Sequence, residues 1–326
     1  MFIRVYLWLQ FCIAAIALAA APPLAHAQTA WPSKPVRIVA PSAAGSAADN
    51  VARIVAPQLS ERIGQPVVVE ARPGAGTILG AEIVAKSPPD GHTLLVGLPG
   101  LAINPSIYKS LPYELKDFAP ITQAVQQPNL VVVHPSLPVR TAKELIALAK
   151  ARPGELAYAS GGVGASSHLT IELFMLMSGT KMLHVPYKGP VPGLIDLVAG
   201  RVQLMATSTS TALPQVRNGR LRALGVTTAK RAAGLPDIPT VAETGLPGYE
   251  SVTWFGFMAP AATPKEIVAR LNKEIVAMLV QPDIKERFAR EGAEVVAGTP
   301  EEFGAYVRAE AAKWAKVVKA AGIKPE

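Results

Sequence analysis

The sequence predicts an α/β fold in which parallel sheets are covered by helices. Strand-like apolar runs alternate with helix-like runs along nearly the whole chain, and this alternation is typical of parallel sheets. Capping signals mark several helix starts, and two loops of very small residues join strands to the helices that follow. With 326 residues, the chain is long enough for two ordinary domains and a sizeable core.

The individual elements follow from the spacing of apolar side chains. Short apolar runs predict strands at residues 36–40, 67–70, 93–97, 130–134, 156–160, 182–186, 202–206, 221–226 and 253–258. Helical spacing is clear in three places, at Val51, Ile54, Val55, Leu59 and Ile63, at Ile267, Leu271, Ile275 and Leu279, and at Phe303, Tyr306, Val307, Ala311, Trp314, Val317 and Ala321.

Three helix starts carry a threonine followed three residues later by a glutamate, which is the pattern of a capping box. Two of them also have a proline that we expect at the first helical position, where its missing N–H costs nothing. The three starts are Thr141 with Glu144, Thr263-Pro264 with Glu266, and Thr299-Pro300 with Glu302.

The first residues have the pattern of a cleavable signal peptide. Arg4 supplies a positive charge, residues 5–21 are almost entirely apolar, and residues 25–27 read Ala-His-Ala, an A-x-A cleavage site. We therefore expect secretion with cleavage after Ala27, so that residues 1–27 are not part of the fold. The alternative is an uncleaved anchor helix, for which the run is short.

The remaining composition excludes several kinds of chemistry. The only cysteine, Cys12, lies in the signal segment, so the mature protein is expected to have no disulfide, thiolate metal site or cysteine nucleophile. Loss of Arg4 lowers the formal charge from +8 to +7. This excess is spread thinly, which gives little support to nucleic-acid or membrane binding and allows at most a mild preference for anions.

Two extended stretches, residues 121–133 and 247–254, are the best candidates for crossings between domains. If the chain crosses at both, residues 128–252 form one lobe, and residues 28–127 with 253–326 form the other. A discontinuous lobe joined by two crossing segments is a hinge geometry with a cleft between the lobes.

Two loops consist almost entirely of small residues. Residues 41–50 read PSAAGSAADN and residues 159–168 read ASGGVGASSH, and each lies between a predicted strand and a predicted helix. Ligands of open α/β sheets bind at such places, where a helix N-terminus offers unpaired backbone N–H groups. Small side chains would let an anion reach those donors. The alternative is that both loops are merely flexible turns.

Catalytic and cofactor interpretations are weaker. Asp49 stands three residues after Ser46, so we expect it to cap a helix rather than act as an acid or base. His168 follows Ser166 and Ser167, which leaves a secreted serine hydrolase as an alternative, although no G-x-S-x-G motif surrounds them. The spacing of residues 74–80 does not fit a dinucleotide motif and predicts a turn leading to a helix. We expect no metal and no cofactor.

The chain contains, in order from about Ala30 to its end, WPSKPVRIVAPSAAGSAAD, IGQPVVVEARPGAGTILGAEIVAKSPPDGHTLL, LAINPSIY, VGASSHL, HVPYKG, LRALGVTT, LPDIPTVAETGLPGYE and WFGFMAP. This series resembles the Bug family, the TctC-like extracytoplasmic solute receptors of tripartite tricarboxylate transporters. The resemblance implies a two-lobed type II periplasmic-binding-protein fold, each lobe a sheet flanked by helices, with the ligand cleft at the hinge. It implies a periplasmic, non-enzymatic receptor, and we expect a monomer.

The resemblance also implies the ligand and the partners. The ligand would be a small organic carboxylate held by backbone amides and ordered waters, and the partner would be a membrane transporter. A sensor that passes its ligand-bound form to a signalling partner, such as a kinase, remains an alternative. The loops and the resemblance together give these candidate ligand-binding residues: Ser42, Ala43, Ala44, Gly45, Ser46, Ala48, Asp49, Leu98, Pro99, Gly161, Val163, Ala165, Ser166, Ser167, His168, Thr207 and Ser208.

The chain departs from the usual family pattern in two places. The first loop usually reads like PFPPGGSTD, and Phe-Asp often stands where this chain has Ala206 and Thr207. The missing aromatic and acidic side chains suggest a wider cleft with less negative charge, and thus a larger anion or one without an amino group. Tighter binding of aspartate or glutamate than of plain di- or tricarboxylates would contradict this hypothesis.

Overall fold

The computed structural model describes residues 31–187, 189–232, 234–290 and 292–323. The chain divides into two units, Met1–Ser33 and Lys34–Glu326, and every described helix and strand belongs to the second unit. The predicted signal peptide, its cleavage site after Ala27 and Cys12 lie outside the described residues. No helix in the described part of the chain combines the length and the apolar character that a membrane span requires.

Ten strands form one connected sheet, and the predicted α/β class is confirmed. The strands are β1 (Val36–Ala40), β2 (Val67–Ala71), β3 (Thr93–Gly97), β4 (Phe118–Val133), β5 (Ala157–Ser160), β6 (Leu183–Pro186), β7 (Leu204–Ser208), β8 (Arg222–Val226), β9 (Val252–Pro260) and β10 (Glu294–Val295). Their main order is β2-β1-β3-β9-β4-β7-β5-β6, with β8 and β10 also pairing with β4.

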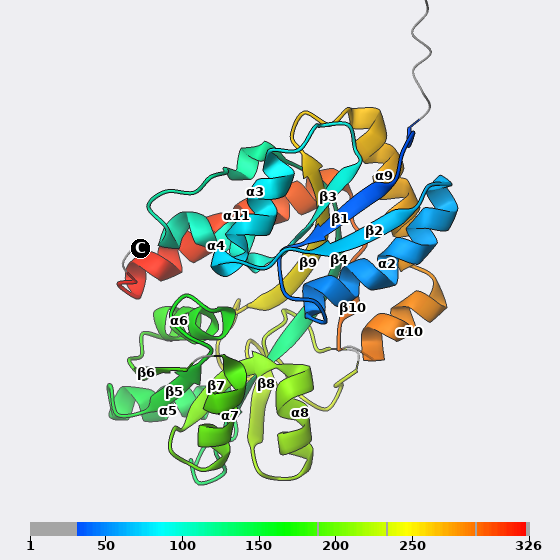
Figure 1. Cartoon of the computed structure of the whole chain (residues 1–326). Helices are drawn as coiled ribbons and strands as arrows, with labels where there is room; N and C mark the ends of the chain where they lie inside the picture. Colours follow the sequence, from blue (N-terminus) through cyan, green and yellow to red (C-terminus); the bar gives the residue numbers. More distant parts are fainter. Residues whose placement is uncertain (1–30, 188, 233, 291, 324–326) are drawn as a thin grey trace, which may run out of the picture. The chain divides into compact units, whose positions relative to one another are not determined.

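Helices follow most of the strands along the chain. They are α2 (Ala47–Ile63), α3 (Ile78–Ala85), α4 (Pro99–Ile107), α5 (Ala142–Ala151), α6 (Ser166–Ser178), α7 (Pro190–Val198), α8 (Thr209–Arg217), α9 (Lys265–Leu279), α10 (Pro282–Arg290) and α11 (Pro300–Ala320), with short 3-10 turns η1 (Ala75–Thr77) and η2 (Leu115–Asp117). In Figure 1 the green helices α5 to α8 surround one half of the sheet, and the blue, cyan, orange and red helices surround the other half.

Strand β4 is the element that the sequence underestimates most. The apolar pattern predicts a strand only over residues 130–134, whereas the strand begins twelve residues earlier, at Phe118. Its first part contains Pro120, Pro128 and several polar residues, which interrupt the apolar run. The register with β9 shifts twice along this part, and such irregularities accommodate residues that fit poorly in a regular strand.

Strand directions place the carboxyl ends of two parallel groups opposite one another. Strands β1, β2 and β3 are mutually parallel, and β3 runs antiparallel to β9, which in turn runs antiparallel to β4. The first group therefore runs in the same direction as β4. Strands β5, β6 and β7 are also parallel to one another, but β7 runs antiparallel to β4. The two groups thus point toward each other along this shared strand.

The register gives the separation of these two facing edges. The last residue of β3 pairs with Gly256, which pairs with Gln123 of β4. The last residue of β7, Ser208, pairs with Asn129 of β4. These two positions on β4 are six residues apart, or about 20 Å at the rise of a strand. The helices that follow β1 and β3 therefore begin on one side of this gap, and those that follow β5, β6 and β7 begin on the other.

The apolar core contains a large cluster and a smaller one. A large apolar cluster includes Trp254, Phe303 and Trp314, and a smaller one packs Leu130 against Met205. Helix α11 contacts α4, β4 and α6, so it touches helices from both groups. The partner of β4 changes from β9 to β7 between Pro128 and Asn129. The lobe boundaries given above stay a prediction.

The three capping signals differ in their outcome. Thr299 forms a full capping box with Glu302, and the Thr141 hydroxyl accepts from the Glu144 amide. The box at Thr263 is wrong, because Pro264 is the N-cap of α9 and makes no side-chain cap bond. The Thr263 hydroxyl is instead buried without a hydrogen-bond partner among the described residues. The proline occupies the cap and not the first helical turn, which shifts the helix start by one residue.

This difference makes a pair of substitutions informative. Replacing Thr299 with alanine should lower the free energy of unfolding by about 1 kcal/mol, because it removes a cap and its reciprocal partner. Replacing Thr263 with valine should leave that free energy unchanged or raise it, because a buried unpaired hydroxyl is exchanged for a methyl group. Urea denaturation of both variants measures the contrast, and an equal loss in both would contradict the assigned helix starts.

Candidate functional site

The N-terminus of α6 leaves backbone donors free for a ligand. Its N-cap residue is Ala165, which has no side-chain oxygen that could accept from the first turn. In the described ranges, the backbone amides of Ser166, Ser167 and His168 have no hydrogen-bond acceptor. Unpaired donors at a helix N-terminus, together with the positive end of the helix dipole, are suited to hold a carboxylate.

The loop before α6 is held by its own hydrogen bonds. The amide of Gly161 donates to Ser167 Oγ at 2.9 Å, and that of Gly162 donates to Ser160 Oγ at 3.1 Å. The amide of Gly164 donates to His168 Nδ1 at 3.0 Å. The predicted donor Gly161 and the predicted ligand contact Ser167 are therefore occupied within the loop. Gly162 and Gly164 both have positive φ values, of 125° and 74°, which explains glycine at these positions.

His168 is placed behind the loop and does not face a ligand. It is buried, with 4% of its surface exposed, and its Nε2 lies 3.4 Å from Glu172 Oε1. No hydrogen bond joins His168 to the side chain of Ser166 or Ser167 in the described part of the chain. The pair of nucleophile and base expected from the sequence, Ser166 or Ser167 with His168, is not formed among the described residues, so the hydrolase alternative gains no support.

The first small-residue loop is organised around Asp49. The Asp49 side chain is 1% exposed and accepts from the Gly45 amide at 2.8 Å and from Arg53 Nε at 2.7 Å. The hydrogen bond from Arg53 is the main cause that lowers the pKa of Asp49. The carboxylate is therefore turned into the cap of α2 and neutralised by the adjacent arginine. Earlier in the same loop, Ala43 and Ala44 are exposed, and their amides have no acceptor among the described residues.

A cavity of about 340 Å³ joins the second loop to α4 and η1. Of the predicted site residues it is lined by Leu98, Pro99, Val163, Ala165 and Ser166. Its two sides approach closely, because a Cβ added at Gly164 would lie 2.8 Å from Ile107 Cδ1. The cavity is not lined by the remaining predicted residues, which are Ser42, Ala43, Ala44, Gly45, Ser46, Ala48, Asp49, Gly161, Ser167, His168, Thr207 and Ser208.

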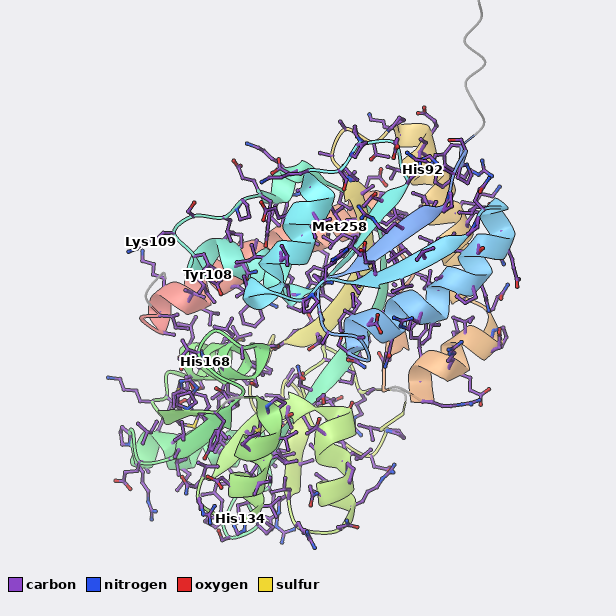
Figure 2. The ribbon with its side chains drawn as sticks, in the orientation of Figure 1. His92, Tyr108, Lys109, His134, His168 and Met258 are labelled. Carbon is purple, nitrogen blue, oxygen red and sulfur yellow. The ribbon has the colours of Figure 1, made fainter. Side chains whose placement is uncertain are left out.

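The sequence prediction missed much of this cavity. The missed lining residues are Gly76, Thr77, Ile103, Asn104, Ile107, Tyr108, Thr253 and Ile323. None of the described residues that line the cavity carries a formal charge. Most of the missed side chains are apolar or uncharged and belong to helices, so they look like ordinary core positions in the sequence. Figure 2 marks Tyr108, at the end of α4, and His168, behind the second loop.

The missed segment η1 has a sequence pattern that indicates an unusual turn. Three successive residues, Ala75, Gly76 and Thr77, have φ values of 45°, 60° and 80°, a conformation that is strained for alanine and more so for threonine. Asn104 Nδ2 donates to the Gly76 carbonyl at 3.1 Å, which helps to hold this turn. The segment Pro-Gly-Ala-Gly at residues 73–76 indicates an unusual turn, although it does not show that the turn faces a cavity.

The end of β7 places Thr207 and Ser208 beside the start of α8. Thr207 is buried, with 4% of its surface exposed, and Ser208 Oγ lies 2.8 Å from Thr211 Oγ1. Ser208 is the N-cap residue of α8, and its hydroxyl therefore reaches a side chain in the first turn of that helix. The α8 start therefore lies on the same facing edge as the α6 start, at the carboxyl end of the neighbouring parallel strand.

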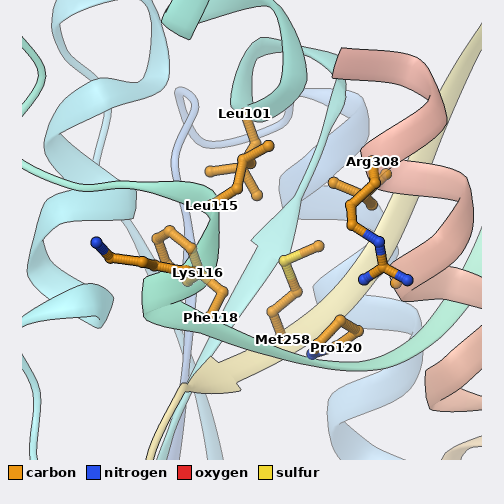
Figure 3. Close-up of a pocket in the computed structure, with 9 residues that line it drawn as sticks. Leu101, Leu115, Lys116, Phe118, Pro120, Met258 and Arg308 are labelled. Carbon is orange, nitrogen blue, oxygen red and sulfur yellow. The ribbon is translucent and has the colours of Figure 1, made fainter. Parts of the chain in front are cut away.

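A second cavity, of about 360 Å³, lies outside this region. It is bounded by α4, the start of β4, β9 and α11, and Figure 3 shows Leu101, Phe118 and Met258 at its walls with Arg308 on one side. None of the predicted ligand-binding residues lines it. It also lacks a helix N-terminus with free donors, so the cavity beside α6 is the better candidate for an anion.

Comparison with known proteins gives a consistent picture. The family described as "Tripartite tricarboxylate transporter family receptor" matches residues 51–323. Protein BugT of Bordetella pertussis is 37% identical over 297 residues, which cover 90% of this chain and 91% of that protein.

Two solved structures carry ligands in their names. "R. palustris Rpa4515 with adipate" is 41% identical, with a TM-score of 0.75, and the match covers 91% of this chain and 100% of that one. "MatC (Rpa3494) from Rhodopseudomonas palustris with bound malate" is 32% identical, with a TM-score of 0.70 and coverage of 88% and 100%. The likeness confirms the expected fold class, that of two-lobed periplasmic solute-binding proteins.

Proposed function

The chain belongs to the tripartite tricarboxylate transporter receptor family, and we propose on that premise that it captures a small organic carboxylate between its two lobes. The observation that carries this proposal is the uncapped start of α6, which has three free amides and whose first residue, Ser166, lines a cavity shared with α4 and η1. The receptors named above with bound adipate and malate support the same class of ligand.

The binding energy is sufficient for a useful affinity. A hydrogen bond to a charged group contributes about 1.5–3 kcal/mol, and micromolar affinity requires about 8 kcal/mol net. The three amides of α6 and the Ser166 hydroxyl would supply part of this energy. The rest would come from donors on the opposite edge and from apolar contact with residues such as Ile103 and Ile107. Tight binding therefore requires both sides of the cleft.

The proposed location and partners follow from the family. Proteins of this family are periplasmic receptors, and a cleavable signal peptide ending at Ala27 would deliver this chain there. Membrane subunits of a tripartite transporter are the proposed partners, to which the ligand-bound receptor would present its cargo. We further propose that the receptor performs no chemistry on the ligand, because neither Ser166 nor Ser167 is hydrogen-bonded to His168 among the described residues.

A thermal-shift screen tests this function directly. A ligand at a hundredfold excess over its Kd should raise the free energy of unfolding by about 2.7 kcal/mol. We expect a clear shift with adipate or malate and none with adipamide, the neutral diamide that keeps the adipate chain. Native mass spectrometry of the purified protein would identify a ligand retained from the cell. Stabilisation by adipamide equal to that by adipate would contradict a carboxylate site.

A further inference from the structure

A partly buried cluster of side chains lies next to the second small-residue loop. The rings of His168 and His184 stack with centroids 3.9 Å apart and an interplanar angle of 8°. The ring of Tyr158 lies 4.9 Å from that of His184. The three rings come from α6, β6 and β5; the loop joins β5 to α6, and β6 is the strand that pairs with β5. The cluster lines no part of the candidate cavity, so a role in direct ligand contact does not explain it.

The hydrogen bonds of His168 define its protonation state. Its Nδ1 accepts from the Gly164 amide at 3.0 Å, so Nδ1 carries no proton. Its Nε2 faces Glu172 Oε1 at 3.4 Å, and the Tyr158 hydroxyl donates to the same oxygen. A carboxylate that already accepts from a tyrosine favours the proton on Nε2, which leaves the Nδ1 lone pair free for the loop. Glu172 therefore fixes the tautomer and the ring orientation of His168, as carboxylates do for many metal-binding histidines.

His184 acts on the loop through Ser160. Its Nε2 lies 2.6 Å from Ser160 Oγ. The same hydroxyl accepts from the Gly162 amide at 3.1 Å and lies 3.2 Å from the Gly162 carbonyl. With a neutral ring, Nε2 can accept the hydroxyl proton, and the Ser160 oxygen remains an acceptor for Gly162. Each histidine therefore helps to fix one glycine amide of the loop. His168 holds the amide of Gly164 directly, and His184 holds that of Gly162 through Ser160.

We propose that the side chains of His168 and His184 have a positioning role: they hold the loop over residues 161–165 in its binding conformation without touching the ligand themselves. The inference rests on the proposed function, since it concerns the same carboxylate site. With the amides of Gly161, Gly162 and Gly164 tied back, the free donors of the loop region are those of Val163 and the first turn of α6. A loop ordered in advance lowers the entropy cost of binding.

The geometry makes this arrangement sensitive to acid. The titratable groups that face the two histidines are Glu172 on α6 and Tyr158 on β5, besides each other. Protonation of His184 at Nε2 would turn the acceptor of the Ser160 hydroxyl into a donor and so disturb the group that holds the Gly162 amide. Burial is the main cause that lowers the pKa of His184 to about 4.

The pH dependence of stability follows from that shift. An unfolded His184 binds its proton near pH 6.5, whereas the folded one does so only near pH 4. The contribution of His184 to stability is therefore complete above pH 6.5 and is lost as the pH falls toward 4. We expect the melting temperature of the wild type to fall over this range, and we expect a smaller fall in His184→Gln, whose amide can still bond Ser160 but does not titrate.

Three variants test the positioning role with adipate as the probe. His168→Leu removes the acceptor of Gly164 and should weaken adipate binding about tenfold or more. His168→Asn should retain most of the affinity, because its side-chain oxygen can accept from Gly164 in place of Nδ1. His134→Leu is the matched control, since His134 Nδ1 also accepts a nearby backbone amide, that of Ser136, but lies far from His168 (Figure 2). It should bind like the wild type.

A readout without ligand separates the two proposals. Hydrogen exchange at the amides of Gly162 and Gly164 should accelerate in ligand-free His168→Leu and Ser160→Ala, but not in His134→Leu. If the wild type bound no carboxylate, the proposed function would fail while the exchange result still decided the role of the histidines. Unchanged exchange at Gly164 in His168→Leu, together with wild-type affinity for adipate, would overturn the positioning role.

Discussion

Replacing Ser166 with proline should weaken carboxylate binding about ten- to 150-fold and leave the melting temperature close to that of the wild type. Proline at the first helical position removes one backbone donor, and a hydrogen bond to a charged group contributes about 1.5–3 kcal/mol. The helix itself should tolerate the change, because this amide has no partner within α6. Ala165 already has φ −63° and ψ 153°, the conformation that a following proline favours.

Two companion variants isolate the backbone donor. Ser166→Ala removes only the hydroxyl and should cost less affinity than the proline variant. Lys265→Pro places proline at the first position of α9, which is not part of the candidate cavity, and should not change binding. Isothermal titration with the carboxylate that gives the largest thermal shift measures all three. Wild-type affinity in Ser166→Pro would show that the α6 amides do not hold the ligand.

The largest effect on stability is expected from Gly256→Ala. Gly256 lies on β9 between Gly97 of β3 and Gln123 of β4. A Cβ at this position would lie 2.3 Å from Phe303 Cζ and 2.7 Å from the Thr122 carbonyl oxygen. Relief would require the aromatic ring of α11 and the backbone of β4 to move together, so we expect a loss of about 3 kcal/mol or more in the free energy of unfolding.

Urea denaturation with two further variants tests this cause. Gly234→Ala should be nearly neutral, because a Cβ at Gly234 would meet no atom within 4 Å and the residue has no left-handed φ. Adding Phe303→Leu to Gly256→Ala should recover part of the loss, since it makes room on the α11 side but not at Thr122. A neutral Gly256→Ala would contradict the packing of α11 against the sheet.

The sequence predicts the alternation of strands and helices because apolar spacing depends on local geometry alone. It fails at β4, where prolines and glutamines hide a strand that pairing with β9 and β10 stabilises. It fails at Thr263 because a threonine three residues before a glutamate does not distinguish a capping residue from the residue before the cap. Both errors arise where tertiary contacts, or a shift of one residue, decide the outcome.

In the candidate site, too, the sequence predicts local features but misses those that depend on tertiary contacts. Small residues before α6 predict an accessible helix start, and that start is uncapped. The sequence predicts that Asp49 takes part in the cap of α2, but it does not show that Arg53 pairs with this carboxylate or that His168 bonds to Gly164. It also misses Thr77 and Ile107, because their place beside the second loop depends on how distant elements pack. Which residues contact a ligand stays a prediction.

The most direct test of the account follows the α6 amides themselves. In a nuclear magnetic resonance titration of isotope-labelled protein with adipate, the amide protons of Ser166, Ser167 and His168 should shift strongly downfield, as expected for new hydrogen bonds to a carboxylate. The amide of Gly164, already bonded to His168, should move much less. Saturable binding of adipate that leaves the three α6 amides unshifted would contradict the claim that this helix start holds the anion.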